Sequence, residues 1–251
     1  GKTISGAAAV HTVCYAVFDG SRAIFQGKRE LEASAADNKN SSSPVIAVAR
    51  DEAFCFYYED NLDLLKKLGA RIQYFSPIRD QEIPPEASAL YLGGGYPELH
   101  AKALSENKTM LSSIREAIRN GMPCIAECGG FLYLHRELED QDGIFYPMAG
   151  VLDAKAYRTN KLGRFGYINL TANEAQLLGD KGMSIRGHEF HYWESEQCGE
   201  SFHAKKPVGK RQWDCVNGNE TLYAGFPHLF FWSAPEAAYT FLKKCEEYGT
   251  C

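Results

Sequence analysis

The sequence contains no dense run of lysine and arginine and no long apolar stretch, and these absences exclude the simplest surfaces for nucleic acid and membrane. Its 251 residues carry 27 lysines and arginines against 32 aspartates and glutamates, a formal net charge of −5 with a pI near 5.8. An acidic chain without a basic patch does not attract a polyphosphate backbone or an anionic bilayer. We therefore expect small molecules or other proteins as partners.

Paired cysteine motifs are also missing. The eight cysteines are irregularly spaced, and Cys124 and Cys128 stand four residues apart with no second pair to complete a zinc site. No segment has the pattern of a signal peptide, and a chain of this size does not need disulfides to fold. We expect reduced thiols, a cytoplasmic location and no bound metal.

The length and the 45% hydrophobic content suit one large domain with a full core. Residues 1–43 differ from the remainder and end in a polar, serine-rich run, so we expect an N-terminal appendage and linker there and the main domain over residues 44–251. Gly1-Lys2-Thr3 resembles the tail of a phosphate-binding loop, but the strand and glycines that should precede it are missing. We predict no cofactor site in this domain.

Alternating strand and helix patterns begin after residue 44. Buried strands are expected at residues 45–49, 71–75, 89–92 and 122–126, and helices at residues 57–68, 110–119 and 235–248. This alternation predicts an α/β fold, a mostly parallel sheet with helices on both faces. After residue 148 the segments are shorter and extended, which predicts additional antiparallel strands in the C-terminal half.

The segment Ala126-Glu127-Cys128-Gly129-Gly130-Phe131 places one cysteine where a short apolar strand gives way to a helix. This pattern is typical of a nucleophile elbow, in which the side chain stands on a sharp turn. We expect the Cys128 sulfur to be exposed there, close to the positive end of the helix dipole and to free amide groups. A plain Cys-Gly-Gly turn is the alternative.

Glycines follow the ends of two predicted strands. Gly94 and Gly95 come after the strand at residues 89–92, and Gly129 follows Cys128. Because the carboxyl ends of parallel strands meet at one edge of the sheet, these glycines are expected near the cysteine. Their backbone amides are candidates for an oxyanion hole, since glycine lets the main chain approach a substrate closely. An ordinary loop is the alternative.

A thiol nucleophile needs a nearby base, and spacing alone does not choose among the seven histidines. Four lie on predicted helices or in segments without other polar chemistry, which leaves His188, His191 and His228 as candidates. The segment from His188 to His191 has an extended pattern and lacks the four-residue helical spacing of a zinc motif. In a strand, His188 would point to one face while Glu189 and His191 point to the other. His188, Glu189 and His191 are candidates for substrate contact, with a purely structural role as the alternative.

Four segments together resemble a known family, the glutaminase domain of cobyrinic acid a,c-diamide synthases, which is a class I-like glutamine amidotransferase of the cobyrinate and cobyrate synthase type. The resemblance runs from about Val45 to Tyr248. The segments are Ala49 to Asn61, Leu92-Gly93-Gly94-Gly95-Tyr96-Pro97-Glu98-Leu99, Ala126-Glu127-Cys128-Gly129-Gly130 and Arg186-Gly187-His188-Glu189-Phe190-His191-Tyr192. The last one favours the a,c-diamide synthases over the cobyric acid synthases. Similar enzymes act on hydrogenobyrinic acid or nickel sirohydrochlorin, so the resemblance does not decide which macrocycle is amidated.

The resemblance implies a flavodoxin-like fold in which Cys128 attacks the side-chain amide of glutamine and His228 is the base. In many class I glutaminases a carboxylate two residues after the histidine orients its ring, but here that position is Phe230. A dyad is therefore expected rather than a triad, and the group that fixes the imidazole is unknown. The family often has His-Leu-His-Phe where this chain has His228-Leu229-Phe230-Phe231.

The resemblance also implies a partner. In the complete synthases a separate N-terminal domain binds ATP and magnesium, activates the carboxylate of the corrinoid or related tetrapyrrole, and receives ammonia from the glutaminase. Residues 1–43 are too few to form such a domain, so we expect it on another domain or subunit. Arg164-Phe165-Gly166-Tyr167 is a candidate contact for the macrocycle or the partner, with a packed turn as the alternative. Competing functions are a cysteine hydrolase of the intracellular-protease-like class and a non-catalytic binding module.

Overall fold

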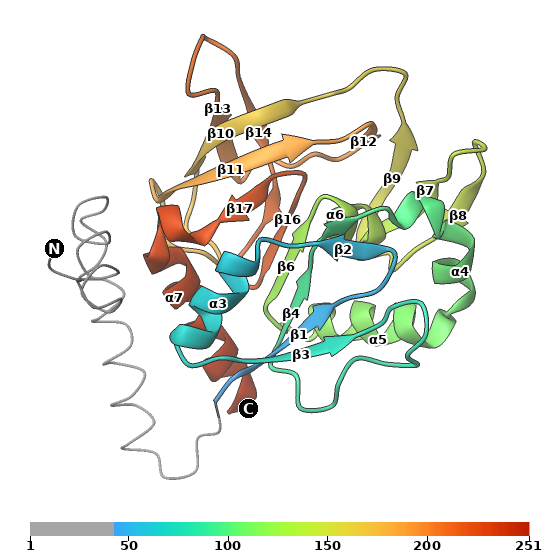
Figure 1. Cartoon of the computed structure of the whole chain (residues 1–251), viewed down its shortest axis with the longest axis horizontal. Helices are drawn as coiled ribbons and strands as arrows, with labels where there is room; N and C mark the ends of the chain where they lie inside the picture. The colour runs from blue at the N-terminus through green and yellow to red at the C-terminus, as the bar shows by residue number, and fades with distance from the viewer. Residues whose placement is uncertain (1–42, 251) are drawn as a thin grey trace, which may run out of the picture.

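The computed structural model describes residues 43–250. The appendage and linker expected over residues 1–43 therefore lie outside the described residues, except for Ser43. Within the described range the order of elements is the one that an α/β fold with an added antiparallel part requires. Figure 1 shows the parallel strands in the lower half of the view and the antiparallel strands above them.

The central sheet has six strands. In spatial order they are β15 (Asn217–Gly218), β16 (Leu222–Gly225), β6 (Cys124–Glu127), β4 (Ala89–Leu92), β1 (Val45–Ala49) and β3 (Arg71–Phe75). All neighbours run parallel except β15 and β16. The strands expected at residues 45–49, 71–75 and 89–92 are confirmed without a shift, because short runs of apolar and β-branched residues leave little choice of register.

Helices cover both faces of this sheet. They are α3 (Glu59–Lys67), α4 (Ala101–Glu106), α5 (Lys108–Arg119), α6 (Gly129–Tyr133) and α7 (Pro235–Gly249), with 3₁₀ turns η1 (Pro97–Leu99) and η2 (Phe231–Ser233). Alternate residues of β1 serve opposite faces: Ile46 and Val48 pack with residues of α3 and α7, while Ala47 and Ala49 pack with residues of α5 and α6. The parallel sheet with helices on both faces is thus confirmed.

The C-terminal half adds antiparallel strands, as expected. One sheet has the order β14 (Gln212–Cys215), β13 (Phe202–Lys205), β10 (Phe165–Ala172), β11 (Ser184–Phe190) and β17 (His228–Phe230). A second sheet, in which β7 and β9 run parallel, has the order β12 (Trp193–Ser195), β9 (Leu152–Arg158), β7 (His135–Glu139) and β8 (Phe145–Pro147). In the N-terminal half, β2 (Phe54–Phe56) pairs antiparallel with β5 (Gly94–Gly95). Among the described helices, none is long and apolar enough to cross a membrane.

A buried asparagine joins the helical layer to the strand that carries His228. The fully buried side chain of Asn61 on α3 donates to the backbone O of Leu229 at 2.7 Å and accepts from the N–H of Phe231 at 2.9 Å. Backbone groups in the interior need such partners, since an unpaired one costs free energy. Asn61 therefore fixes β17 against the main domain.

We predict that Asn61→Ala lowers the free energy of unfolding by about 3 kcal/mol, because it leaves one buried C=O and one buried N–H unpaired. The control is Asp63→Ala on the same helix, which removes an exposed contact with Lys66 and should change stability by less than about 0.5 kcal/mol. Urea unfolding followed by circular dichroism measures both. Equal effects of the two substitutions would contradict the assignment.

Candidate functional site

Cys128 stands at a sharp turn between a buried strand and a helix, as the sequence predicts. β6 ends at Glu127, α6 begins at Gly129, and Cys128 between them has φ 48° and ψ −100°. A non-glycine residue rarely adopts a positive φ, so surrounding contacts must hold it there. The N–H of Cys128 donates to Gly225 O at 2.8 Å, and its carbonyl accepts from Leu132 N at 2.9 Å.

Close packing behind the turn requires glycine. The N–H of Gly130 donates to Gly93 O at 2.8 Å, and a Cβ atom on Gly130 would lie 2.0 Å from the carbonyl oxygen of Leu92. No side chain fits at that distance, so α6 can approach the end of β4 only because residue 130 is glycine. The local sequence Cys-Gly-Gly therefore determines both the turn and the position of the helix.

The expectation that the Cys128 sulfur is exposed is wrong. The residue is 9% exposed, and its Sγ atom lies 4.0 Å from the backbone O of Phe190 at the end of β11. The strand-to-helix turn itself projects the thiol from the parallel sheet, but the antiparallel part of the chain covers it. This cover arises from residues about sixty positions away in the sequence, which no local pattern could reveal.

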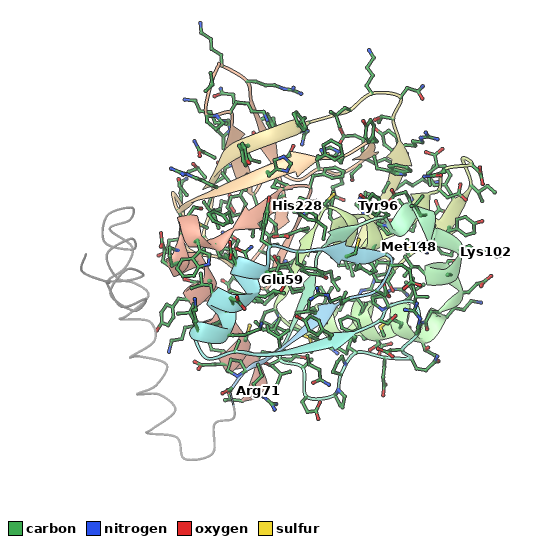
Figure 2. All side chains as sticks on the ribbon, viewed as in Figure 1. Glu59, Arg71, Tyr96, Lys102, Met148 and His228 are labelled. Atoms are coloured by element: carbon green, nitrogen blue, oxygen red, sulfur yellow. The ribbon has the colours of Figure 1, made fainter. Side chains whose placement is uncertain are left out.

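His228 on β17 is the histidine that the structure brings to Cys128. The two side chains lie close enough to interact, and the His228 ring is buried. Its ring lies edge-on to Phe56 with centroids 4.7 Å apart, and a Cβ on Gly94 would fall 2.4 Å from its Cε1 atom. Figure 2 shows His228 between the parallel sheet and the antiparallel strands. The ring is thus held tightly from both sides.

A carboxylate that the sequence reasoning missed faces the same ring. Oε2 of Glu127 lies 3.5 Å from Nδ1 of His228, and Glu127 is 1% exposed. Oε1 of Glu127 accepts from the N–H of Leu229 at 2.9 Å, and the hydroxyl of Tyr91 lies 3.2 Å from Oε2. The expected cysteine and histidine dyad therefore has a buried carboxylate beside it. A glutamate that closes an apolar strand directly before the cysteine was the available signal.

These contacts change the charge of the histidine. Burial by itself disfavours the charged ring, but the Cys128 thiol and then the Glu127 carboxylate outweigh that penalty and raise the pKa of His228 from its ordinary 6.5 to about 10. Because the folded pKa is above the ordinary one, the ring keeps its proton as pH rises from 6.5 toward 10. At neutral pH the site therefore contains an imidazolium ion between the sulfur of Cys128 and the carboxylate of Glu127.

The three predicted oxyanion glycines lie together beside the cysteine. Gly94 and Gly95 form β5, and a Cβ on Gly129 would lie 3.0 Å from the backbone N of Gly95. Gly129 is the first residue of α6, where N–H groups have no carbonyl partner within the helix. Gly94 also lies against the ring of His228. The positive end of the α6 dipole therefore points to the same place as the thiol.

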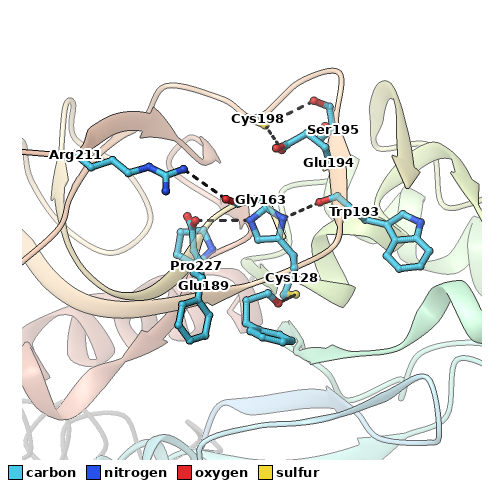
Figure 3. A network of polar contacts seen from close by, with 12 residues as sticks. Cys128, Gly163, Glu189, Trp193, Glu194, Ser195, Cys198, Arg211 and Pro227 are labelled. Carbon is cyan, nitrogen blue, oxygen red and sulfur yellow. Dashed lines mark hydrogen bonds and ion pairs between the residues drawn. The ribbon is translucent and has the colours of Figure 1, made fainter. Parts of the chain in front are cut away.

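Three predicted site residues remain, His188, Glu189 and His191, and the structure places His188 in different surroundings from the other two. His188 is half-buried and pairs in register with His228 across β11 and β17. Glu189 and His191 are buried instead, and Nε2 of His191 lies 3.7 Å from Oε2 of Glu189. Nδ1 of His191 lies 2.7 Å from the backbone O of Trp193, and the His191 ring stacks on Phe226. Figure 3 shows Glu189 and Trp193 in this polar network, with Cys128 beneath it.

Six of the cysteines fall within the described residues and all six are free: Cys55, Cys124, Cys128, Cys198, Cys215 and Cys245. Burial raises the pKa of the Cys124 thiol above its ordinary range, so this neighbour of the elbow stays protonated at neutral pH. Between residues 43 and 250 no group of three or more histidine, cysteine, aspartate or glutamate side chains is placed to hold a metal ion. Cys128 is thus the cysteine that the fold brings to the histidine.

We predict that the ring of His228 remains protonated at pH 8. Imidazole ¹⁵N chemical shifts, recorded between pH 5 and 10, should show a midpoint well above 6.5. In Cys128→Ala the midpoint should fall, because one of the two contacts that raise the pKa of His228 is lost. A midpoint near 6.5 in the unmodified protein would contradict this description of the site.

Comparisons with known proteins agree with this geometry. The cobyrinate a,c-diamide synthase of Caldanaerobacter subterraneus subsp. tengcongensis is 41% identical over 206 residues, which cover 81% of this chain and 46% of that protein. The enzyme of the same name from Fusobacterium nucleatum subsp. nucleatum is 42% identical over 195 residues, covering 76% of this chain and 42% of that protein. The chain thus spans less than half the length of these curated relatives.

Solved structures resemble the fold at low sequence identity. A structure of PurLQS from Thermotoga maritima has a TM-score of 0.55 at 14% identity, and a crystal structure of a glutamine amidotransferase has a TM-score of 0.53 at 20% identity. Both comparisons cover 82% of this chain and 99% of the other. They confirm the class I glutamine amidotransferase fold. The model of the CobB/CobQ-like glutamine amidotransferase domain matches residues 45–236, a span that contains the elbow and the histidine, and the chain belongs to this family.

Proposed function

We propose that this chain is a glutaminase module that hydrolyses glutamine through a cysteine thioester and supplies ammonia for the amidation of the a and c carboxylates of cobyrinic acid or a related tetrapyrrole. The observation that supports this most is the contact between Cys128, on its elbow, and the buried imidazole of His228. A cysteine sulfur whose proton has passed to a neighbouring imidazole is an activated nucleophile. The names of the relatives, cobyrinate a,c-diamide synthases, support the choice of acceptor.

The first half of the reaction forms the thioester. The thiol proton resides on His228, and the Cys128 sulfur attacks the side-chain carbonyl carbon of glutamine to give a tetrahedral oxyanion. His228 then donates its proton to the amide nitrogen, the carbon–nitrogen bond breaks, and ammonia leaves. A glutamyl thioester on Cys128 and a neutral imidazole remain.

The second half releases glutamate. Neutral His228 removes a proton from water as the water oxygen attacks the thioester carbonyl. The carbon–sulfur bond then breaks and the sulfur leaves as a thiolate, so the protonated ring and the thiolate are restored together. One glutamine and one water therefore become one glutamate and one ammonia, and the site returns to its starting charge.

Backbone amides stabilise the oxyanion in both halves. The N–H of Gly129 at the start of α6 and the N–H of Gly95 on β5 are the donors we assign, because the two glycine backbones lie against each other beside Cys128. Charge that develops next to a helix N-terminus is stabilised without rearrangement of the protein. His188, Glu189 and His191 remain candidates for substrate contact; of these, half-buried His188 is the one with solvent-accessible surface.

The amidation step requires a partner in this proposal. The curated relatives are more than twice as long as the segment matched here, so the unmatched part has room for an ATP-dependent synthetase domain. That domain would bind ATP and magnesium and activate the acceptor carboxylate, and the ammonia made at Cys128 would react with it. The ATP-binding domain and the tetrapyrrole are therefore the partners that we assign, together with glutamine.

An exposed aromatic face over the thiol is the docking surface that we assign to the synthetase domain. Tyr167 is 74% exposed and its ring lies 5.4 Å from that of His188, while Phe165, 56% exposed, contacts both His188 and Phe190. The ring of Phe190 in turn contacts that of Tyr192, with the two centroids 5.8 Å apart. A continuous exposed aromatic patch marks an interaction site. The carbonyl of Phe190 faces Sγ of Cys128, so a domain docked here would stand next to the source of ammonia.

We predict that Cys128→Ala lowers glutamine hydrolysis by at least about 10³-fold, since no other group can form the thioester. Labelling by 6-diazo-5-oxo-norleucine, an electrophile that mimics glutamine, should disappear as well. Cys55→Ala is the control, because this exposed cysteine should leave both readouts unchanged. Glutamate release measured by a coupled assay and intact mass spectrometry test the prediction, and labelling retained in Cys128→Ala would contradict it.

We predict that Tyr167→Ser lowers glutamine-dependent amidation about tenfold more than ammonia-dependent amidation, because it removes about 1.4 kcal/mol of contact with the synthetase domain. Amide product is measured by mass spectrometry with the chain combined with its synthetase partner, ATP and magnesium. Ile144→Ser, on an exposed apolar residue of the β7–β8 turn, should leave the ratio unchanged. An unchanged ratio in Tyr167→Ser would exclude this face as the docking surface.

A further inference from the structure

Glu127 is a buried carboxylate that the proposed acyl transfer does not use. It ends β6, an interior strand of the parallel sheet, one residue before Cys128. The preceding residues of the strand, Cys124 to Ala126, are apolar and fully buried. An ionised carboxylate in such a place is costly unless hydrogen bonds and a cation compensate it. Its presence there calls for a function.

We propose that Glu127 is a positioning residue that fixes the orientation and tautomer of the His228 imidazole through Nδ1, and that it replaces the carboxylate missing at Phe230. The proposal rests on the glutaminase function proposed above. Oε2 of Glu127 faces Nδ1 of His228. A carboxylate at Nδ1 keeps the proton on that nitrogen, so Nε2 is left to exchange a proton with the Cys128 sulfur and then with the leaving amine.

Charge balance supports this pairing. Within residues 43–250 the cationic group in an ion pair with Glu127 is His228, and both side chains are buried. The carboxylate therefore stabilises the charged form of the ring, since water cannot do so. The Glu127 contact is one of the two that raise the pKa of His228 to about 10, against the opposing effect of burial. The carboxylate thus keeps a proton at the site.

The carboxylate is itself held from two directions. The hydroxyl of Tyr91 on β4 lies 3.2 Å from Oε2 of Glu127, and the N–H of Leu229 on β17 donates to Oε1 at 2.9 Å. Burial raises the pKa of Tyr91 well above 10, so this hydroxyl remains a neutral donor. Because Leu229 adjoins His228, the carboxylate and the ring are fixed to the same strand, and Asn61 also holds that strand, through the backbone O of Leu229 and the N–H of Phe231.

The distance between the Glu127 carboxylate and the His228 ring is the one expected for a site without bound substrate. At 3.5 Å, Nδ1 and Oε2 are slightly farther apart than in a short hydrogen bond. Contacts of catalytic groups are often long without substrate and shorten when charge develops in the complex. The ring cannot escape in the other direction, because Phe56 and Gly94 lie against it. A small movement toward Glu127 therefore completes the hydrogen bond.

Other ionisable groups face this pair and must be considered in any pH profile. Cys128 contacts the ring of His228 from the elbow, and His188 faces it from β11. Burial and then the charge of His228 lower the pKa of His188, so this histidine loses its proton at a lower pH than His228 does. Tyr58 and Tyr91 face Glu127, and burial raises the pKa of both, so both are neutral over the working range. A shift in the midpoint of His228 therefore reports its two partners, Cys128 and Glu127.

The test is Glu127→Gln, which keeps the shape and an oxygen that accepts from Leu229 N but removes the negative charge. We expect kcat for glutamine hydrolysis to fall at least about 100-fold, as for a histidine held in the wrong tautomer, with KM within about threefold. The ¹⁵N-detected protonation midpoint of His228 should fall by at least about one pH unit, because a neutral amide no longer stabilises the cation.

Tyr91→Phe is the matched control, because it removes a contact with the same carboxylate oxygen but leaves the charge. It should lower kcat and the midpoint of His228 much less than Glu127→Gln does. Equal effects of the two substitutions would show a general disturbance of the core and overturn the proposal. A kcat within about threefold of the unmodified protein together with an unchanged midpoint in Glu127→Gln would overturn it as well.

Two further readouts keep the inference separate from the glutaminase function. The protonation midpoint is measured on the resting protein, so it tests Glu127 even if glutamine is not the substrate, whereas absence of any labelling at Cys128 overturns the glutaminase function alone. If Glu127→Gln does not fold, Glu127→Asp retains the charge at a greater distance. We expect its midpoint to fall but to stay above 6.5, and a midpoint unchanged from the unmodified protein would overturn the positioning role.

Discussion

The backbone of Cys128 is the constraint on which the whole site depends. A non-glycine residue with φ 48° stores about 1–3 kcal/mol of strain and persists only where its surroundings enforce it. The hydrogen bonds to Gly225 and from Leu132, together with the contact of Gly130 with Leu92, do this from the parallel sheet and its helix. The sulfur is therefore placed by the buried parallel sheet and the helix that follows it.

The antiparallel part supplies what the parallel sheet lacks. β17 provides the histidine, and the end of β11 covers the thiol. Glu127 joins the two parts, since it belongs to β6 but binds Leu229 and faces His228 on β17. In the mechanism that we propose, the base and the nucleophile come from different sheets, and the buried carboxylate sets their relative position. The proposed reaction therefore uses residues from both kinds of sheet.

Much of the fold and of the elbow could be predicted from the sequence, because both depend on local patterns. The strand, the turn at Cys128 and the glycines Gly129 and Gly130 are contiguous in the sequence. Because alternate residues of a strand point to opposite faces, the sequence also predicts that His188 and Glu189 have different surroundings. The cover over the thiol and the partners of Glu127 could not be predicted. Tyr91 lies 36 positions and Leu229 102 positions from Glu127, so only the folded chain brings them together. The choice of His228 needed the family resemblance, since the sequence patterns left three histidines.

The central claim is that the buried sulfur of Cys128 attacks glutamine, and trapping the covalent intermediate tests it most directly. The protein is mixed with glutamine, quenched in acid within one turnover, digested and examined by mass spectrometry. The account predicts one glutamyl group, as an acid-stable thioester, on the peptide that contains Cys128. A glutamyl group on a different cysteine, or glutamate release with no acylated peptide at any quenching time, would contradict it.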